Sequence, residues 1–165
     1  MKERLVGAYM KTAEVFAELS HARRLHVGAI IVKDDRIVSI GYNGMPAGWD
    51  NNCENTVYVL DEEVMGTDMI ALGYTQTETG NWVKLKTKPE VLHAETNALA
   101  KLAKSTESGN NATMFITHAP CLDCAKLIYQ SGINSVFYRD AYRVEDGIQF
   151  LRTSGVTVTQ TKKDS

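Results

Sequence analysis

The 165-residue chain has 18 Lys and Arg against 20 Asp and Glu, a formal net charge of −2 at pH 7. With 44% hydrophobic residues it is long enough to bury one core, so we expect a single domain over residues 1–165. The slightly acidic balance gives no electrostatic drive toward a nucleic-acid polymer, although it is compatible with a small anionic ligand. No apolar run reaches 18 residues, so no membrane partner is expected either.

The cysteines indicate a reducing compartment. Of the three, Cys121 and Cys124 form a C-x-x-C motif, which leaves Cys53 as an odd one. An odd count with one close pair is unlike a disulfide framework. The first residues begin an amphipathic segment and show no signal-peptide pattern. We therefore expect a soluble, cytoplasmic protein.

The first part of the chain predicts a helix followed by a β-hairpin. Apolar residues recur at helical spacing over residues 2–19. Val27–Val32 and Ile37–Ile40 are typical of two strands. The polar stretch Lys33-Asp34-Asp35-Arg36 between them predicts a tight turn, and hence an antiparallel pair.

Residues from about 44 to 90 show no strong periodicity and are predicted to form an irregular insertion. A stretch of about 45 residues without regular structure inside a compact domain usually has a function. It directly precedes His93, which belongs to a motif described below. We expect an arm over a ligand or a subunit contact, with Trp49, Tyr58 and Trp82 as packing groups. A plain surface insertion is the alternative.

After this stretch, helices and strands alternate along the chain. The predicted helices are Val91–Lys104, Cys121–Ser131 and Arg143–Thr153, and the predicted strands are Thr113–Thr117, Ser135–Tyr138 and Val156–Thr159. Such alternation favours an α/β fold in which helices cover both faces of a sheet.

Two motifs in this last part supply metal-ligating side chains. His93-Ala94-Glu95 is predicted in the first turn of one helix, and Pro120-Cys121-Leu122-Asp123-Cys124 opens the next. Two thiolates and one imidazole leave the fourth position of a tetrahedral zinc open for water, as in a catalytic site. Zinc lowers the pKa of bound water from roughly 15.7 to about 7, a gap on the order of 12 kcal/mol. Glu95 is not needed as a ligand and can move protons.

Two other interpretations of these residues stay open at this point. A C-x-x-C motif at the start of a helix also occurs in thioredoxin-like redox pairs, although that leaves His93 and Glu95 unexplained. Alternatively His118, three residues before Cys121, could complete a closed structural zinc site. A closed site has no exchangeable water, so it could not perform hydrolysis.

A third segment narrows the comparison with known families. The H-x-E and P-C-x-x-C motifs are those of zinc-dependent nucleobase deaminases. With Val27-Gly28-Ala29-Ile30-Ile31-Val32 and Gly41-Tyr42-Asn43-Gly44-Met45-Pro46-Ala47-Gly48, the chain resembles the deoxycytidylate (dCMP) deaminase family of the cytidine deaminase superfamily. The resemblance implies a cytidine deaminase-like three-layer α/β/α sandwich with a mixed central sheet. It implies hydrolysis of dCMP to dUMP and ammonia, which supplies thymidylate synthesis, with one Zn²⁺ on His93, Cys121 and Cys124 and with Glu95 as the catalytic proton shuttle.

Substrate contacts also follow from the resemblance. Asn43 is expected at the sugar 3′-hydroxyl, and the backbone around Ala94 and Ala119 at the pyrimidine edge. A 5′-phosphate needs cationic or hydroxyl donors, and Ser20 and Arg24, in a family-like S-x-x-x-R-x-x-V-G spacing, are the candidates. Weaker phosphate candidates, for which a solvated surface charge is the simpler interpretation, are Lys126, Arg139 and Arg143.

Regulation and assembly rest on the resemblance alone. Members of the family are typically homohexamers, activated by dCTP with Mg²⁺ and inhibited by dTTP. Gly41, Tyr42, Asn43 and Gly44 would belong to that effector site. No second zinc is expected, because Cys53 alone does not complete a ligand set. The alternatives are a deaminase of another base or nucleoside and a zinc-stapled binding module without turnover.

Overall fold

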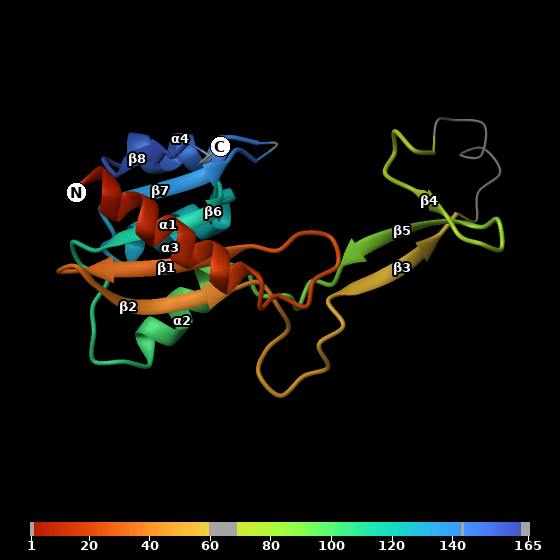
Figure 1. Ribbon diagram of the computed structural model, residues 1–165, viewed down its shortest axis with the longest axis horizontal. Helices are drawn as coiled ribbons and strands as arrows, with labels where there is room; N and C mark the ends of the chain where they lie inside the picture. The colour runs from red at the N-terminus through yellow and green to blue at the C-terminus, as the bar shows by residue number, and fades with distance from the viewer. Residues whose placement is uncertain (1, 60–68, 143, 163–165) are drawn as a thin grey trace.

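The computed structural model describes residues 2–59, 69–142 and 144–162. Its helices are α1 (Glu3–Ala17), α2 (Ala94–Ala103), α3 (Leu122–Gln130) and α4 (Asp146–Thr153). Its strands are β1 (Gly28–Lys33), β2 (Arg36–Tyr42), β3 (Glu54–Tyr58), β4 (Thr75–Gln76), β5 (Trp82–Thr87), β6 (Thr113–His118), β7 (Ser135–Asp140) and β8 (Thr157–Gln160). Strands β3, β4 and β5 form an arm (residues 54–59 and 69–87) that projects from the body, which is the rest of the described chain (Figure 1).

The sheet of the body has five strands in the order β2-β1-β6-β7-β8. Strand β1 pairs antiparallel with β2 and β6, whereas β6, β7 and β8 run parallel to one another. Between β1 and β2, Asp34 and Asp35 have φ values of 49° and 55°, the left-handed conformation that a two-residue hairpin turn requires. The predicted hairpin and the predicted mixed central sheet are both confirmed.

Helices cover both faces of this sheet (Figure 1). Because successive strand residues point to opposite faces, Ile30 and Phe115 face one side and Ile31 and Met114 the other. Helix α1 packs on the first side, and α2, α3 and α4 contribute to the core on the second. The predicted three-layer α/β/α sandwich is therefore confirmed. None of the described helices is long and apolar enough to cross a membrane.

The predicted irregular stretch of residues 44–90 is partly wrong, because it contains the antiparallel sheet β3-β5-β4. Its strands escaped prediction because they bury almost nothing: Glu54 is the one buried residue of β3. Only β5 shows a short alternation of apolar and polar residues, Val83-Lys84-Leu85-Lys86, and none of its residues is fully buried. Of the expected packing groups, Trp49 and Tyr58 are exposed in the single chain and Trp82 is half-buried. Residues 60–68 of the stretch lie outside the described residues.

Some predicted helix boundaries also shift. The helix predicted from Val91 begins at Ala94, because Leu92 forms a β-bridge with Gly44. Their backbone N–H groups each donate to the other's carbonyl, at 3.1 and 2.9 Å, which keeps Leu92 extended. The helix predicted from Arg143 begins at Asp146, and Arg143 itself lies outside the described residues.

Candidate active site

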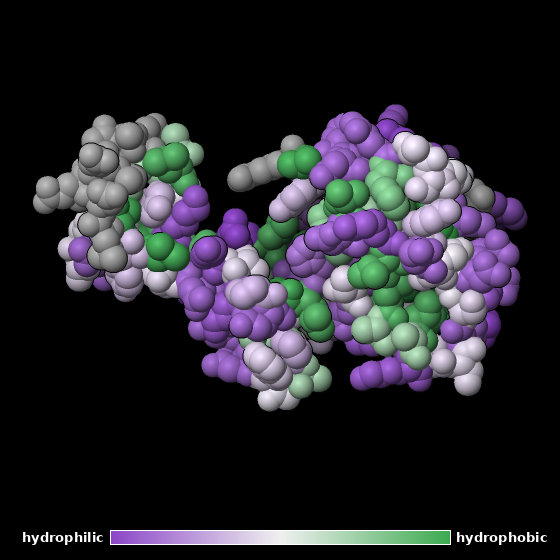
Figure 2. All heavy atoms as spheres, turned by 180° about the vertical axis from the view of Figure 1, so that it is seen from behind, coloured by the Kyte–Doolittle hydropathy of each residue, from purple (hydrophilic) through white to green (hydrophobic). Residues whose placement is uncertain are grey.

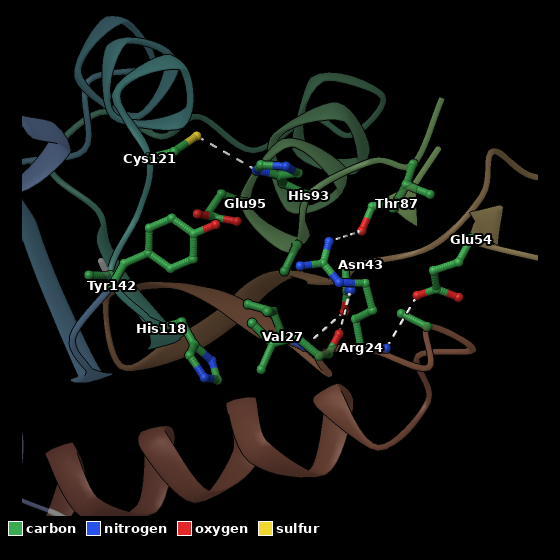
Figure 3. Close-up of a pocket in the computed structure, with 15 residues that line it drawn as sticks. Arg24, Val27, Asn43, Glu54, Thr87, His93, Glu95, His118, Cys121 and Tyr142 are labelled. Atoms are coloured by element: carbon green, nitrogen blue, oxygen red, sulfur yellow. Dashed lines mark hydrogen bonds between the residues drawn. The ribbon is translucent and has the colours of Figure 1, made fainter. Parts of the chain in front are cut away.

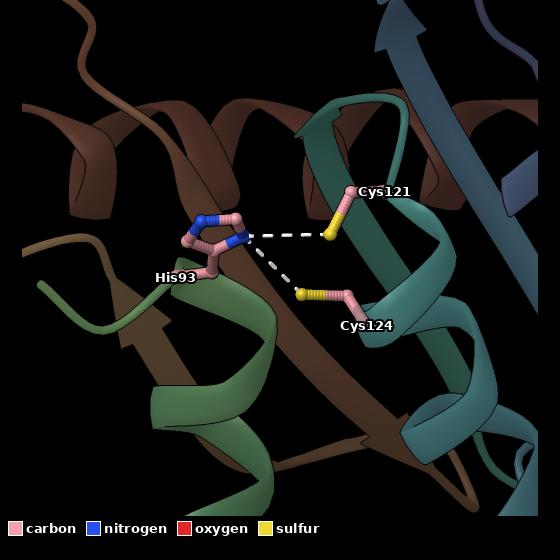
Figure 4. A group of neighbouring side chains, drawn as sticks. All are labelled: His93, Cys121 and Cys124. Carbon is pink, nitrogen blue, oxygen red and sulfur yellow. Dashed lines mark hydrogen bonds between the residues drawn. The ribbon is translucent and has the colours of Figure 1, made fainter. Parts of the chain in front are cut away.

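Two helix N-termini bring three potential metal ligands together (Figure 4). His93 is the N-cap residue of α2, Cys121 is the N-cap residue of α3, and Cys124 lies in the first turn of α3. His93 Nδ1 is 3.7 Å from Cys121 Sγ and 3.4 Å from Cys124 Sγ. Tetrahedral zinc, with Zn–S near 2.3 Å and Zn–N near 2.0 Å, would separate nitrogen and sulfur by about 3.5 Å. The cluster therefore has the dimensions of a zinc site.

Proton sharing makes this cluster attractive to a cation. A hydrogen bond from the Cys124 thiol, followed by one with the His93 imidazole, lowers the pKa of Cys121 to about 4. The same bond raises the pKa of Cys124, and the bond with Cys121 raises the pKa of His93. The N-terminus of α3 adds its positive partial charge to the stabilisation of a thiolate. A divalent cation would replace the shared protons, as metal binding to thiols and imidazole generally does.

Glu95 stands beside the cluster without belonging to it. It lies in the first turn of α2, is only 4% exposed, and is not among the three residues whose ligand atoms lie within 4.8 Å of one another. Burial raises the pKa of its carboxyl to about 6. A buried carboxylic acid next to a metal-ligand set is typical of a group that transfers protons.

Two members of the cluster, His93 and Cys121, line a cavity of about 360 Å³ together with Glu95 (Figure 3). This volume lies at the lower end of the range of small-molecule sites. Cys121, His93 and Glu95 line one side, and Arg24 and Thr87 lie on the side away from Cys121. The other lining residues are Ala22, Leu25, Val27, Asn43, Glu54, Val91, Ala94, His118, Ala119 and Tyr142.

His118 does not complete a closed site in this structure. Its Nδ1 lies 3.1 Å from Thr117 Oγ1, and its Nε2 lies 3.7 Å from Asp140 Oδ2. Among the residues that the structure describes, the metal-ligand group consists of His93 and the two cysteines. The structure therefore supports the open, three-ligand arrangement.

Comparison with known proteins agrees with this arrangement. Residues 4–140 match the sequence family described as the cytidine and deoxycytidylate deaminase zinc-binding region. The chain belongs to this deaminase family. It is 34% identical over 157 residues to the deoxycytidylate deaminase of Enterobacteria phage T4, covering 83% of this chain and 79% of the phage protein. It is 36% identical over 141 residues to the human deoxycytidylate deaminase, covering 84% and 66%.

A solved deaminase structure extends the likeness to the whole chain. The dCMP deaminase of cyanophage S-TIM5, in complex with dCMP and dUMP, superimposes with a TM-score of 0.77 at 41% identity. The match covers 98% of this chain and 99% of that one. As a member of this family the chain is a hydrolytic deaminase, which excludes a thioredoxin-like redox pair and a binding module without turnover.

Asn43, a predicted substrate contact, lines the pocket of this deaminase. Its side chain also binds the backbone of two other lining residues, Leu25 and Val27. Its side-chain Oδ1 accepts the Val27 N–H at 2.8 Å, and its Nδ2 donates to the Leu25 carbonyl at 2.8 Å. Ser20, a predicted phosphate contact, is buried; its hydroxyl donates to the Asn43 carbonyl at 2.8 Å and accepts the Ala22 N–H at 3.2 Å. Through these bonds Ser20 connects the loop that carries Arg24 to the backbone at Asn43, which is a structural role.

Ala94 and Ala119, the predicted backbone contacts, both line the pocket. Ala94 is the first residue of α2, so its N–H has no acceptor within the helix. The Ala119 N–H, in contrast, donates to the Asp140 carbonyl at 2.8 Å. Ala119 can therefore contact a base through its carbonyl oxygen.

The predicted effector residues make structural contacts within the body, and these contacts alone explain why such residues stand at these positions. A Cβ atom on Gly41 would lie 2.1 Å from the Ala94 carbonyl oxygen, so only glycine lets β2 approach α2 this closely. The Tyr42 carbonyl accepts a hydrogen bond from Asn97 Nδ2 at 2.8 Å, and Gly44 forms the bridge to Leu92. Their effector role stays a prediction.

The weaker phosphate candidates lie away from the pocket lining. Lys126 pairs with Asp123 at 2.7 Å on the exposed side of α3. Arg139 forms ion pairs with Glu14 at 2.6 Å and Asp140 at 2.7 Å. Lys126, whose side chain is 51% exposed, fits the simpler interpretation of a solvated surface charge, whereas Arg139 is 17% exposed and forms structural ion pairs. Arg143 lies outside the described residues.

Among the pocket residues that were not predicted from the sequence, three have polar side chains: Glu54, Thr87 and Tyr142. Figure 3 shows the Tyr142 ring beside Glu95, on the chain that follows β7. Strand order could have indicated Tyr142, since residues after the carboxyl ends of parallel strands gather at one sheet edge. Glu54 and Thr87 lie at the base of the arm, whose strands gave no sequence signal.

Proposed function

We propose that this chain is a zinc-dependent dCMP deaminase that produces dUMP and ammonia. The observation that carries the proposal is one cavity lined by two members of the three-donor zinc set, by a buried carboxylate outside that set, and by an arginine on the opposite side. The two lining donors are His93 and Cys121, the carboxylate is Glu95 and the arginine is Arg24. The cyanophage structure, whose match covers 98% of this chain at 41% identity, is a complex with dCMP and dUMP. This supports the same substrate here.

The residues divide the chemistry between them. His93, Cys121 and Cys124 would hold Zn²⁺, which supplies a hydroxide nucleophile near neutral pH. Glu95 takes a proton from the attacking water and passes protons to the ring nitrogen and then to the departing amine. The water oxygen forms a bond to C4 of cytosine, the C4–N4 bond breaks, and ammonia leaves.

The rest of the pocket would recognise the nucleotide. Ala94 and Ala119 offer backbone groups to the pyrimidine edge, and the Arg24 guanidinium is suited to the 5′-phosphate. Asn43 Oδ1 has a second lone pair beyond the one used by Val27, so it can still accept a hydrogen bond from the sugar 3′-hydroxyl.

Assembly and regulation belong to the same proposal. Exposed apolar side chains on α3 support a contact between copies in a homohexamer: Leu122, Leu127 and Tyr129. Figure 2 views the molecule from the side away from α1, and apolar surface interrupts the polar surface of the body there. Activation by dCTP with Mg²⁺ and inhibition by dTTP, like the cytoplasmic location, stay predictions. Light scattering tests the assembly, and the dependence of rate on dCMP with each effector tests the regulation.

Ammonia release from a panel of substrates tests the activity. Zinc-loaded protein should deaminate dCMP much faster than CMP, deoxycytidine, cytosine, guanine or adenosine. A faster rate with one of the other compounds would replace dCMP by that substrate. Absence of ammonia from every compound, with zinc bound, would refute the proposal.

A further inference from the structure

A second buried carboxylate lies outside the metal centre, where the arm joins the body. Glu54 is the first residue of β3, is 1% exposed and lines the pocket. Its register partner on β5 is Thr87. A buried carboxylate is stable only when hydrogen bonds replace the water it has lost. The partners of Glu54 therefore show what it holds in place.

The hydrogen-bond partners of the carboxylate all belong to the loop between α1 and β1. Glu54 Oε1 accepts the backbone N–H of Arg23 at 2.9 Å and that of Arg24 at 3.3 Å. Its Oε2 accepts Nε of Arg23 at 3.4 Å, and its own carbonyl accepts Nη2 of Arg23 at 3.4 Å. The carboxylate thus fixes the backbone at Arg24, over a sequence separation of 30 residues.

The other end of Arg24 is fixed at the same place. Its Nη1 donates to Thr87 Oγ1 at 3.0 Å, so backbone and guanidinium are both attached to the Glu54–Thr87 pair (Figure 3). A guanidinium carries five N–H donors, so this bond leaves others for an anion in the pocket. A long side chain held at both ends has less freedom to lose when it binds a phosphate.

We propose that Glu54 is a positioning residue for nucleotide recognition, which holds the Arg24 guanidinium toward the 5′-phosphate and so makes the base of the arm part of the binding site. This inference rests on the proposed deamination of dCMP. It differs from a purely structural role in one respect. A structural staple would affect all substrates alike, whereas a positioning residue affects those that carry a phosphate.

The experiment compares dCMP with deoxycytidine, which lacks the phosphate. Glu54→Ala should raise KM for dCMP about 10- to 30-fold with kcat within about twofold, because two backbone donors lose their acceptor and the loop moves. Turnover of deoxycytidine should stay within about threefold. Glu54→Gln keeps an acceptor oxygen and should restore KM to within about threefold of the original value.

A double-mutant cycle then links Glu54 to Arg24. Arg24→Ala should also raise KM for dCMP, and the double variant Arg24→Ala/Glu54→Ala should be no worse than Arg24→Ala alone. Glu107→Gln is the matched control, since it removes a carboxylate that pairs with Arg36 at 3.2 Å on the surface. This variant should change the kinetic constants for neither dCMP nor deoxycytidine.

Three results would overturn the inference: equal losses with dCMP and deoxycytidine, an unchanged KM for dCMP in a folded Glu54→Ala protein, or fully additive effects in the cycle. If Glu54→Ala does not fold, Thr87→Val tests whether the fixed position of Arg24 matters for dCMP binding, because it removes only the side-chain hydrogen bond to Arg24. It should raise KM for dCMP about threefold, and no change would contradict the inference. Failure of the proposed function looks different, since the unaltered protein would then not deaminate dCMP at all.

Discussion

The sheet of the body and the sheet of the arm differ in what covers them. Five of the six residues of β1 are buried between α1 on one face and α2 on the other, whereas β3 buries only Glu54. The metal-ligand cluster lies on the body, at the start of two helices that pack against its sheet. Fold stability and catalytic geometry should therefore depend on the body, and ligand recognition on the base of the arm.

Replacing one buried cysteine at the metal-ligand cluster and another beside the base of the arm tests this division most strongly. Cys124→Ser should lose most bound zinc, and with it at least about 10³-fold in activity, because an alcohol is a poor substitute for a thiolate ligand. Cys53→Ser, next to the base of the arm, should keep its zinc, since Cys53 does not belong to the metal-ligand group and its thiol lies 3.4 Å from the Asn51 carbonyl. Metal analysis and ammonia release on both proteins provide the comparison. Zinc loss in both variants, or in neither, would contradict it.

The two buried carboxylates should differ in the same way. Glu95→Gln should lower kcat by about 10²- to 10⁴-fold with dCMP and deoxycytidine alike, because it removes the proton shuttle. Zinc content and melting temperature should stay close to those of the original protein. Glu54→Gln, the matched change at the arm, should leave kcat for dCMP within about twofold and KM within about threefold, because the amide keeps an acceptor oxygen. A Glu95→Gln protein with ordinary kcat would show that another group moves the proton.

Two nearby glycines differ in their surroundings: Gly41 packs against α2 inside the body, whereas Gly44 faces open space. Gly41→Ala should reduce the free energy of unfolding by about 2–4 kcal/mol, because its Cβ would overlap the Ala94 carbonyl and force α2 outward. Gly44→Ala should change it by less than about 1 kcal/mol, since nothing lies within 4 Å of the added carbon. Urea denaturation of both variants measures the difference. Similar losses would show that α2 adjusts to the added methyl group.

The smallest effects come from one substitution made in both sheets. Val136→Thr in β7 should cost about 1–2 kcal/mol, because Val136 is 0% exposed and the hydroxyl would be buried without a planned partner. Val57→Thr in β3, where the side chain is 38% exposed, should stay within about 0.5 kcal/mol. Both residues stay β-branched, so strand propensity is matched. Denaturation midpoints decide, and a larger loss at Val57 would mean that the arm stabilises the body.

The same contrast explains what the sequence could predict. Cys121 and Cys124 lie within one helical turn, and His93 lies two residues from Glu95. These short spacings are visible in the sequence, so the metal site could be predicted from its motifs. The strands of the body were predictable because burial gives them apolar runs. Glu54 was not, since its partners lie 30 and 31 residues away in a loop. The arm strands carry at most the short alternation Val83-Lys84-Leu85-Lys86, because β3 is mostly exposed and β5 is at most half-buried.

His93 and Cys121 each stand immediately before the first residue of a helix. The positions of these two ligands are thus set where α2 and α3 start and do not depend on how far either helix continues. Later turns can lengthen, shorten or acquire a new surface during evolution while the metal geometry stays the same. A family built this way can change its outer surfaces and its assemblies freely around an unaltered reaction centre.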